Sequence, residues 1–203
     1  RVRKMHSSYR STFRTIGDVP LAMITRDKIT HIKPEYHKRR NDRNVKILPY
    51  FNEKTCMLYY YPGMDSEVID AMVDKGYKGI VIVGTGLGHV NKKIYPAIER
   101  AHKKGVCMYM TLQTLWGYVH MNVYDTGRDL QAAGIVPAEN MLPEVAFVKL
   151  GWALGQTEDP EEVKKIMLTP INDETTKREP YNGYLVYQGG IPEVEAFVKS
   201  FRK

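Results

Sequence analysis

Cysteine is scarce in this chain, and its histidines are badly spaced for metal binding. Cys56 and Cys107 are the two cysteines among 203 residues, and both fall in segments that read as buried strands, where a free thiol behaves as a small hydrophobic side chain. The six histidines form no HxxxH pair, and no Cys-x-x-Cys occurs. The sequence therefore predicts neither a disulfide nor a metal site.

Long apolar runs are also absent. No stretch approaches the roughly 18 consecutive apolar residues of a membrane span, and no signal peptide opens the chain. We therefore expect a cytoplasmic protein without membrane contact. The chain starts at Arg1 rather than Met, inside a polar stretch, so we also expect it to be part of a longer protein.

Acidic residues are few in the first part of the chain. Residues 1–50 contain 13 Lys or Arg against 4 Asp or Glu, whereas residues 51–203 contain 17 against 19. A basic segment of this kind is typical of contact with a polyanion such as RNA. It is equally typical of a solvated basic surface, and the lack of interleaved aromatic residues favours that second interpretation.

The most informative stretch is an apolar strand that runs into a glycine-rich loop and then a helix. Residues 80–83 form a β-branched run, which predicts a strand buried on both faces of a parallel sheet. Gly84, Gly86 and Gly88 follow, and Asn91 is a good N-cap for a helix that Gly105 ends. Loops at the carboxyl ends of parallel strands are where α/β proteins place their ligands.

The glycine spacing excludes two common ligand sites. The pattern is GxGxG followed by His89, not the GxGxxG of a dinucleotide site, and no acidic residue follows about twenty positions on to hold a ribose. A phosphate-binding loop is excluded because no Lys-Ser/Thr pair follows the last glycine. A tight turn without a ligand remains an alternative.

Strand and helix patterns alternate from residue 55 onward, which predicts an α/β fold with a parallel sheet and flanking helices. Strands are expected at 55–61, 80–83 and 106–110. The helix starts expected from capping signals are Asp65, Asn91, a capping box of Thr126 and Asp129, Pro143 and Asp159. The helix over 142–154 carries few charges, so we expect it to be covered on most sides.

Composition changes near residue 45, after the charged stretch 36–43. We predict three parts: residues 1–45, an α/β domain over 46–170, and an extension over 171–203. The extension reads as a strand followed by an amphipathic helix with its apolar side chains at helical spacing, a pattern that predicts docking within the domain or on another subunit.

Four colinear stretches resemble one known family. They are VRKMHSSYRSTFR, YPGMDSEVID, GYKGIVIVGTGLGHV and HMNVYDTGRDLQAAGIVPAENMLPEVAFVKL. Together they resemble the type I L-asparaginase-like amidohydrolases and, within that family, the D subunits of archaeal glutamyl-tRNA(Gln) amidotransferases. The resemblance covers residues 1 to about 170.

The resemblance implies a flavodoxin-like parallel sheet, which is the asparaginase C-terminal domain, preceded by the tail end of the catalytic N-terminal domain. Members of the family attack a side-chain amide with a Thr hydroxyl that a second Thr, an Asp and a Lys activate. The Lys falls on Lys4, while the other three would lie upstream of Arg1. We therefore expect residues 1–203 alone to be inactive, because a Thr hydroxyl needs an adjacent base relay.

The resemblance also implies partners and a site. The loop residues Gly84, Thr85, Gly86, Gly88 and His89 would help to close the active site of the neighbouring subunit in a homodimer formed through the C-terminal domain. Asn122, Tyr124 and Asp125 are weaker candidates for the same contact. No cofactor is expected in this chain. ATP and magnesium would act on a partner E subunit, which converts Glu-tRNA(Gln) to Gln-tRNA(Gln) with the released ammonia.

Four positions depart from the D-subunit pattern. Val83 stands where Glu is usual, Leu112 where Ser is usual, and Tyr118 and His120 where Arg and Asn are expected. A divergent or inactive paralogue thus stays open. Two further functions also stay open: a free-standing cytoplasmic L-asparaginase, and a non-catalytic α/β interaction module.

Overall fold

The computed structural model describes residues 1–8, 12–24, 26–31 and 44–179. The chain divides into two compact units. Unit 1 comprises Arg1–Lys46 and Thr176–Lys203, and unit 2 comprises Ile47–Thr175. The strand and amphipathic helix predicted after residue 180 lie outside the described residues.

Unit 1 contains two short antiparallel ribbons. Strand β1 (Val2–Lys4) pairs with β2 (Phe13–Thr15), and β3 (Ala22–Ile24) pairs with β4 (Ile29–His31). The fully buried Ile16 follows β2. Thr176 joins this unit by accepting a hydrogen bond from Arg1 and donating one to the Gly17 carbonyl, both at 3.4 Å. Thr176 is therefore held beside the start of the chain.

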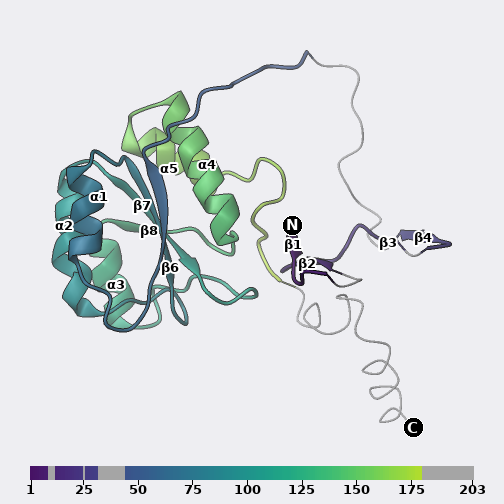
Figure 1. The fold of residues 1–203 in the computed structure, drawn as a ribbon, viewed down its shortest axis with the longest axis horizontal. Helices are drawn as coiled ribbons and strands as arrows, with labels where there is room; N and C mark the ends of the chain where they lie inside the picture. The colour runs from purple at the N-terminus through teal and green to yellow at the C-terminus, as the bar shows by residue number, and fades with distance from the viewer. Residues whose placement is uncertain (9–11, 25, 32–43, 180–203) are drawn as a thin grey trace, which may run out of the picture. The chain divides into compact units, whose positions relative to one another are not determined.

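Unit 2 is built on a four-stranded parallel sheet in the order β5-β6-β7-β8 (Figure 1). The strands are β5 (Thr55–Tyr59), β6 (Gly79–Gly84), β7 (Cys107–Leu112) and β8 (Ile135–Pro137). The helices are α1 (Glu67–Asp74), α2 (Tyr95–Lys103), α3 (Asp125–Ala132), α4 (Pro143–Gln156) and α5 (Pro160–Leu168), with a 3₁₀ turn η1 (Lys92–Ile94) before α2. The predicted α/β fold with a parallel sheet is confirmed.

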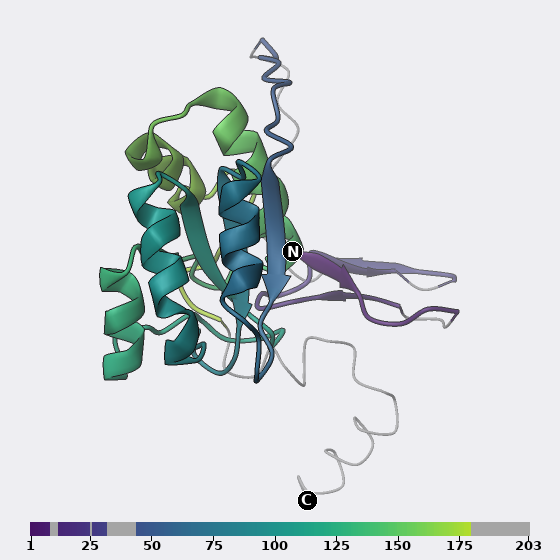
Figure 2. The ribbon, with the colours of Figure 1, turned by 60° about the vertical axis from the view of Figure 1, so that its left-hand side comes forward.

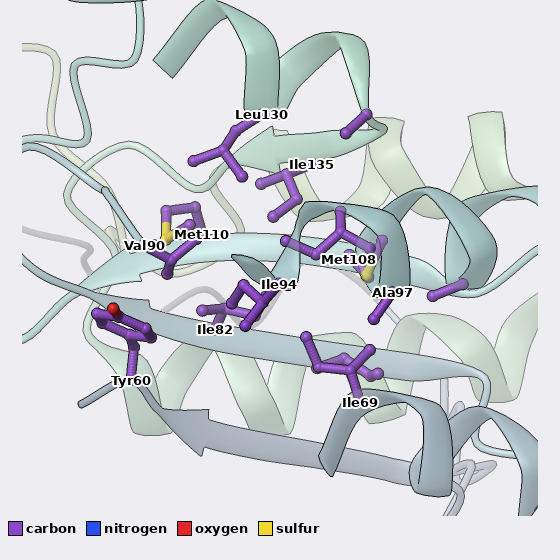
Figure 3. Close-up of a cluster of buried hydrophobic side chains, with 14 of the residues drawn as sticks. Tyr60, Ile69, Ile82, Val90, Ile94, Ala97, Met108, Met110, Leu130 and Ile135 are labelled. Atoms are coloured by element: carbon purple, nitrogen blue, oxygen red, sulfur yellow. The ribbon is translucent and has the colours of Figure 1, made fainter. Parts of the chain in front are cut away.

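Helices cover both faces of this sheet. Helices α1, α2 and α3 lie on one face, and α4 and α5 on the other (Figure 2). Strand side chains alternate between the two layers: Ile80 and Ile82 pack toward the first, whereas Val81 packs toward the second. Figure 3 shows the first layer, where Ile82, Met108 and Met110 meet side chains of the crossover helices. Burial on both faces explains the uninterrupted apolar run of β6.

Several helix starts follow the local signals. The Asn91 side chain accepts a hydrogen bond from the Lys93 amide at 2.9 Å, although the turn that it caps is η1, which leads into α2. Asp159 caps α5 by accepting from the Glu161 amide at 3.1 Å, and Pro143 is the first residue of α4. Each signal acts within one turn of helix, which is why it can be read without the fold.

The predicted capping box of Thr126 and Asp129 is wrong. Helix α3 begins at Asp125, so Thr126 lies inside its first turn and its hydroxyl bonds elsewhere. Strand β8 is not among the predicted strands, since its three residues end in a proline that cannot donate to a neighbouring strand. Proline is acceptable there because β8 is the edge strand of the described sheet.

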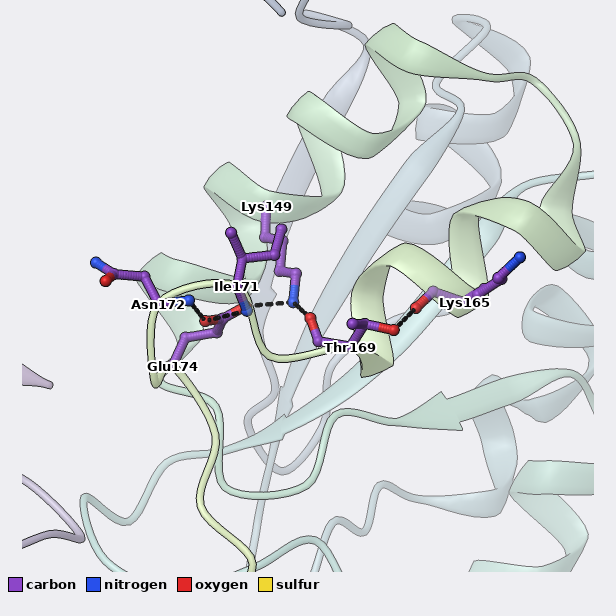
Figure 4. Close-up of polar contacts among 6 residues, drawn as sticks. All are labelled: Lys149, Lys165, Thr169, Ile171, Asn172 and Glu174. Atoms are coloured by element: carbon purple, nitrogen blue, oxygen red, sulfur yellow. Dashed lines mark hydrogen bonds and ion pairs between the residues drawn. The ribbon is translucent and has the colours of Figure 1, made fainter. Parts of the chain in front are cut away.

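The helix over 142–154 is less covered than predicted. Val145 and Val148 are 37% and 56% exposed on α4, so one face of the helix is open in the described part of the chain. Lys149, in contrast, is buried. Its ammonium group donates to the Thr169 carbonyl at 2.7 Å and pairs with Glu174, which also accepts from the Ile171 and Asn172 amides (Figure 4). This cluster ties the segment after α5 to α4.

None of the helices in the described ranges is long and apolar enough to cross a membrane.

Candidate functional site

The glycine-rich loop leaves the carboxyl end of β6, between the ends of its two neighbouring strands. The Tyr60 amide donates to the Val83 carbonyl at 3.1 Å, and the Gln113 amide donates to the Gly84 carbonyl at 3.0 Å. The first bond joins the loop to the end of β5 and the second to the end of β7. The loop is therefore held on both sides where parallel strands present their C-terminal ends.

The loop closes on itself as a tight turn. The Thr85 amide and hydroxyl both donate to the His89 carbonyl, at 3.0 and 3.1 Å, and the His89 amide donates back to the Thr85 carbonyl at 2.9 Å. Gly86 and Gly88 have φ angles of +54° and +102°, which explains two of the three glycines. A Cβ on Gly88 would also lie 2.8 Å from a Val119 methyl group. A Cβ on Gly84 would lie 2.6 Å from the Met110 sulfur, so close approach occurs at Gly84 and Gly88, whereas a Cβ on Gly86 would meet open space.

His89 projects from this turn onto the start of α3. Its Nδ1 lies 3.3 Å from the Thr126 hydroxyl, and its ring meets Tyr124 edge-on with centroids 5.5 Å apart. The other ring nitrogen, Nε2, is buried without a hydrogen-bond partner in the described structure. The ring is thus oriented through one nitrogen, and the second is left for a group that the described residues do not supply.

Sequence patterns do not single out two residues of this region. Thr126 resembles a helix cap in the sequence, and 37 positions separate it from the histidine that it contacts. Gln113 donates its side-chain amide to the carbonyls of Tyr60 and Val83, at 2.5 and 3.1 Å. One side chain thus links the ends of β5 and β6. A polar residue directly after a buried strand is the signal that could have indicated Gln113.

Of the weaker candidates, Asn122 and Tyr124 lie in the loop before α3, and Asp125 is the first residue of that helix. Asn122 accepts from Gln131 through its side chain and from Arg128 through its carbonyl, both at 2.9 Å. The Asp125 carboxylate accepts from the Thr126 amide at 2.7 Å. Of this group, Tyr124 is the side chain that the structure brings to His89.

The four unusual positions divide into two pairs. Val83 and Leu112 are buried at the carboxyl ends of β6 and β7, so neither offers a polar group to the loop. The rings of Tyr118 and His120 meet at a tilt of 37° with centroids 5.7 Å apart, and the His120 amide donates to the Leu87 carbonyl at 3.0 Å. Of the second pair, His120 contacts the glycine loop through its backbone amide.

Lys4 is exposed at the end of β1, in unit 1, opposite Phe13. The loop belongs to unit 2. The role predicted for Lys4 and its relation to His89 thus stay predictions. Among the described residues, no group of three or more His, Cys, Asp or Glu side chains is arranged to hold a metal ion.

Comparison with known proteins matches this region to one family. Residues 54–167 match the model of the glutaminase/asparaginase C-terminal domain. The chain is 50% identical over 186 residues to the D subunit of glutamyl-tRNA(Gln) amidotransferase from Thermococcus kodakarensis, covering 91% of this chain and 42% of that protein. The corresponding protein of Metallosphaera sedula is 46% identical over 179 residues, covering 88% and 40%. The chain thus spans less than half the length of these curated relatives.

Solved structures agree on the fold. The thermostable L-asparaginase from Thermococcus kodakarensis superposes with a TM-score of 0.76 at 30% identity, covering 87% of this chain and 53% of that one. L-asparaginase I from Vibrio cholerae gives 0.75 at 27% identity, with the same coverage.

Proposed function

Because the chain belongs to the glutaminase/asparaginase C-terminal domain family, we propose that it is part of the ammonia-generating subunit of a tRNA-dependent amidotransferase. The observation that carries this proposal is the 50% identity to a D subunit, against 30% to an L-asparaginase from the same organism. The identity extends over 91% of the chain and so reaches both compact units.

The proposed reaction is the hydrolysis of a side-chain amide. A Thr hydroxyl, supplied by the remainder of the protein, loses its proton to the relay that includes Lys4 and attacks the amide carbon. The C–N bond breaks, the nitrogen leaves as ammonia, and water then hydrolyses the acyl ester to the carboxylate. A partner subunit that uses ATP and magnesium would transfer the ammonia to Glu-tRNA(Gln).

His89 and its loop are proposed to complete the active site of a second subunit in a homodimer. Support comes from the rigid turn, the fixing of Nδ1 by Thr126 and the unpartnered Nε2. A second subunit or its substrate would supply the group that Nε2 lacks. The apolar side chain of Val83 is then tolerated, because the bonds that hold the loop at this position are accepted by the Val83 carbonyl, from the Tyr60 amide and the Gln113 side chain.

A free-standing cytoplasmic L-asparaginase is the second candidate, and the TM-score of 0.76 favours it equally on fold alone. The two candidate functions differ in the components that each reaction requires. An asparaginase releases ammonia from free asparagine without tRNA, whereas the D-subunit role predicts that a partner, ATP and Glu-tRNA(Gln) are needed for productive transfer. Activity of the full-length protein with and without these components separates the two.

Subunit mixing tests the shared site. In the full-length protein, a Lys4→Ala subunit and a His89→Ala subunit should each be impaired. Mixing the two variants should restore one intact composite site per heterodimer. A Thr157→Ala subunit, changed at the far end of α4, serves as the matched control in place of His89→Ala and should already be active unmixed. Proven heterodimers without recovered activity would remove His89 from a neighbour's site.

A further inference from the structure

Gln113 lies across the carboxyl end of β6, at the base of the glycine loop. It directly follows β7, and its backbone amide donates to the Gly84 carbonyl at 3.0 Å. Its side-chain nitrogen, Nε2, donates to the Val83 carbonyl at 3.1 Å and to the Tyr60 carbonyl at 2.5 Å. Tyr60 directly follows β5, and the strand order is β5-β6-β7, so the side chain passes over the end of β6 to reach it. One residue thus connects three strand ends.

These contacts fix which way the side-chain amide of Gln113 faces. Both neighbouring atoms are carbonyl oxygens, which accept hydrogen bonds, so the NH₂ group must face them and both of its donors are used. The amide oxygen, Oε1, is attached to the same carbon and therefore faces away from the two carbonyls. Within the described part of the chain it accepts no hydrogen bond. Gln113 is exposed, so this oxygen can meet a group from outside the chain.

The hydrogen bonds that join the strands also make Oε1 an oriented acceptor. An exposed glutamine side chain is otherwise free to change rotamer. This acceptor lies at the carboxyl end of a parallel sheet, where α/β proteins bind their ligands. The turn from Thr85 to His89 starts at the same strand end, and the buried Nε2 of His89 also has no partner among the described residues. Two polar atoms that lack partners thus come from residues attached to one strand end.

From this geometry we infer that Gln113 binds the substrate of the candidate site: its Oε1 accepts a hydrogen bond from an N–H group of the amide substrate. The class of substrate is taken from the proposed function, on which this inference rests. The NH₂ group of Gln113 positions the side chain and the base of the loop, whereas Oε1 contacts the ligand. Because the acceptor is already oriented, little rotamer entropy is lost when the ligand binds.

Two replacements separate the two groups of the side chain. Gln113→Lys keeps donors, since its ammonium group reaches the same two carbonyls, but it has no acceptor. Gln113→Glu keeps an acceptor but places a carboxylate against two carbonyl oxygens. In the full-length protein, Gln113→Lys should raise the KM for L-glutamine about tenfold, the factor for one hydrogen bond, and leave kcat within about twofold of wild type. If Gln113 only joined the strands, this variant would have an unchanged KM.

Hydrogen exchange measures the loop separately from the substrate contact. The His89 amide donates to the Thr85 carbonyl at 2.9 Å. In the 203-residue protein, its exchange should be as slow in Gln113→Lys as in the wild type. In Gln113→Glu it should be about tenfold faster, because the base of the loop is no longer held.

Gln156→Lys is the matched control. The Gln156 side chain also donates to two backbone carbonyls, those of Tyr50 and Trp152, at 2.8 and 3.0 Å. It is the last residue of α4 and takes no part in the glycine loop. This variant should therefore change neither the KM for glutamine nor the exchange of the His89 amide.

Calorimetric binding of L-glutamine distinguishes a failure of the contact from a failure of the proposed function. If the full-length wild type binds glutamine but releases no ammonia, the proposed function fails, and a tenfold weaker affinity of Gln113→Lys still supports the contact. If the wild type is active and Gln113→Lys keeps its KM and affinity, the contact is overturned and the proposed function stands. A higher KM that comes with faster exchange of the His89 amide in Gln113→Lys assigns the loss to the loop and also overturns the contact. Absence of glutamine binding by the wild type overturns both.

Discussion

Replacing Lys149 with methionine should lower the free energy of unfolding by about 2 to 4 kcal/mol at pH 7. Methionine keeps most of the length of the side chain but removes the charge that pairs with Glu174. Both side chains are under 10% exposed, at 6% and 9%, so water replaces the lost contact poorly. The amides of Ile171 and Asn172 still donate hydrogen bonds to the Glu174 carboxylate in the variant. The expected loss of stability is therefore smaller than for a buried carboxylate left without any partner.

The pH dependence of the same variant gives a second, independent measurement. Burial on its own would raise the pKa of Glu174, but hydrogen bonds from Lys149 and the Asn172 and Ile171 amides lower it from 4.5 to about 2. Because the folded pKa lies below the unfolded one, this stabilisation is present above pH 4.5 and is lost as the pH falls toward 2. Much of this stabilisation is therefore already gone at pH 3.

Urea unfolding of the wild type and Lys149→Met at pH 7 and pH 3 measures both effects. The stability difference between the two proteins should shrink at pH 3, because the variant has already lost the contact that lowers the pKa of Glu174. Lys165→Met is the control: that lysine is 73% exposed beside Glu162 on α5, and its removal should cost under about 0.5 kcal/mol at either pH. A Lys149→Met cost below about 0.5 kcal/mol, or one that does not change with pH, would refute the reasoning.

The glycine loop and the catalytic hypothesis give three further predictions. Gly88→Ala should lower the free energy of unfolding in urea by about 3 kcal/mol, since residue 88 combines a φ of +102° with a close Cβ contact. Gly86→Ala should lower it by about 1 kcal/mol, because residue 86 has a φ of +54° and its Cβ would meet open space. Equal losses for the two variants would contradict the packing argument. In the full-length protein, Lys4→Ala should lower kcat by on the order of 100-fold with little change in KM, and a kcat within threefold of wild type would remove Lys4 from the relay. Purified residues 1–203 should release no ammonia from glutamine or asparagine, and measurable release would show that the nucleophile lies within this chain.

Local signals in the sequence predicted much of the α/β unit. The apolar run before the glycines indicated β6, Asn91 and Asp159 marked helix starts, and Pro143 marked the first residue of α4. Each of these depends on the backbone conformation or hydrogen bonds of a few consecutive residues, so no tertiary contact is needed to read it. The alternation of strands and helices was then enough for the parallel sheet.

Tertiary structure decided what distant residues do together. Thr126 resembles a helix cap, but α3 begins at Asp125, so Thr126 lies in the first turn of the helix and its hydroxyl contacts His89 of the glycine loop. Lys149 reads as a surface charge on an apolar helix, yet the returning segment 169–175 buries it against Glu174. Such contacts join residues that are far apart in the sequence. They form only when whole layers of helices and strands pack together, so the local sequence does not predict them.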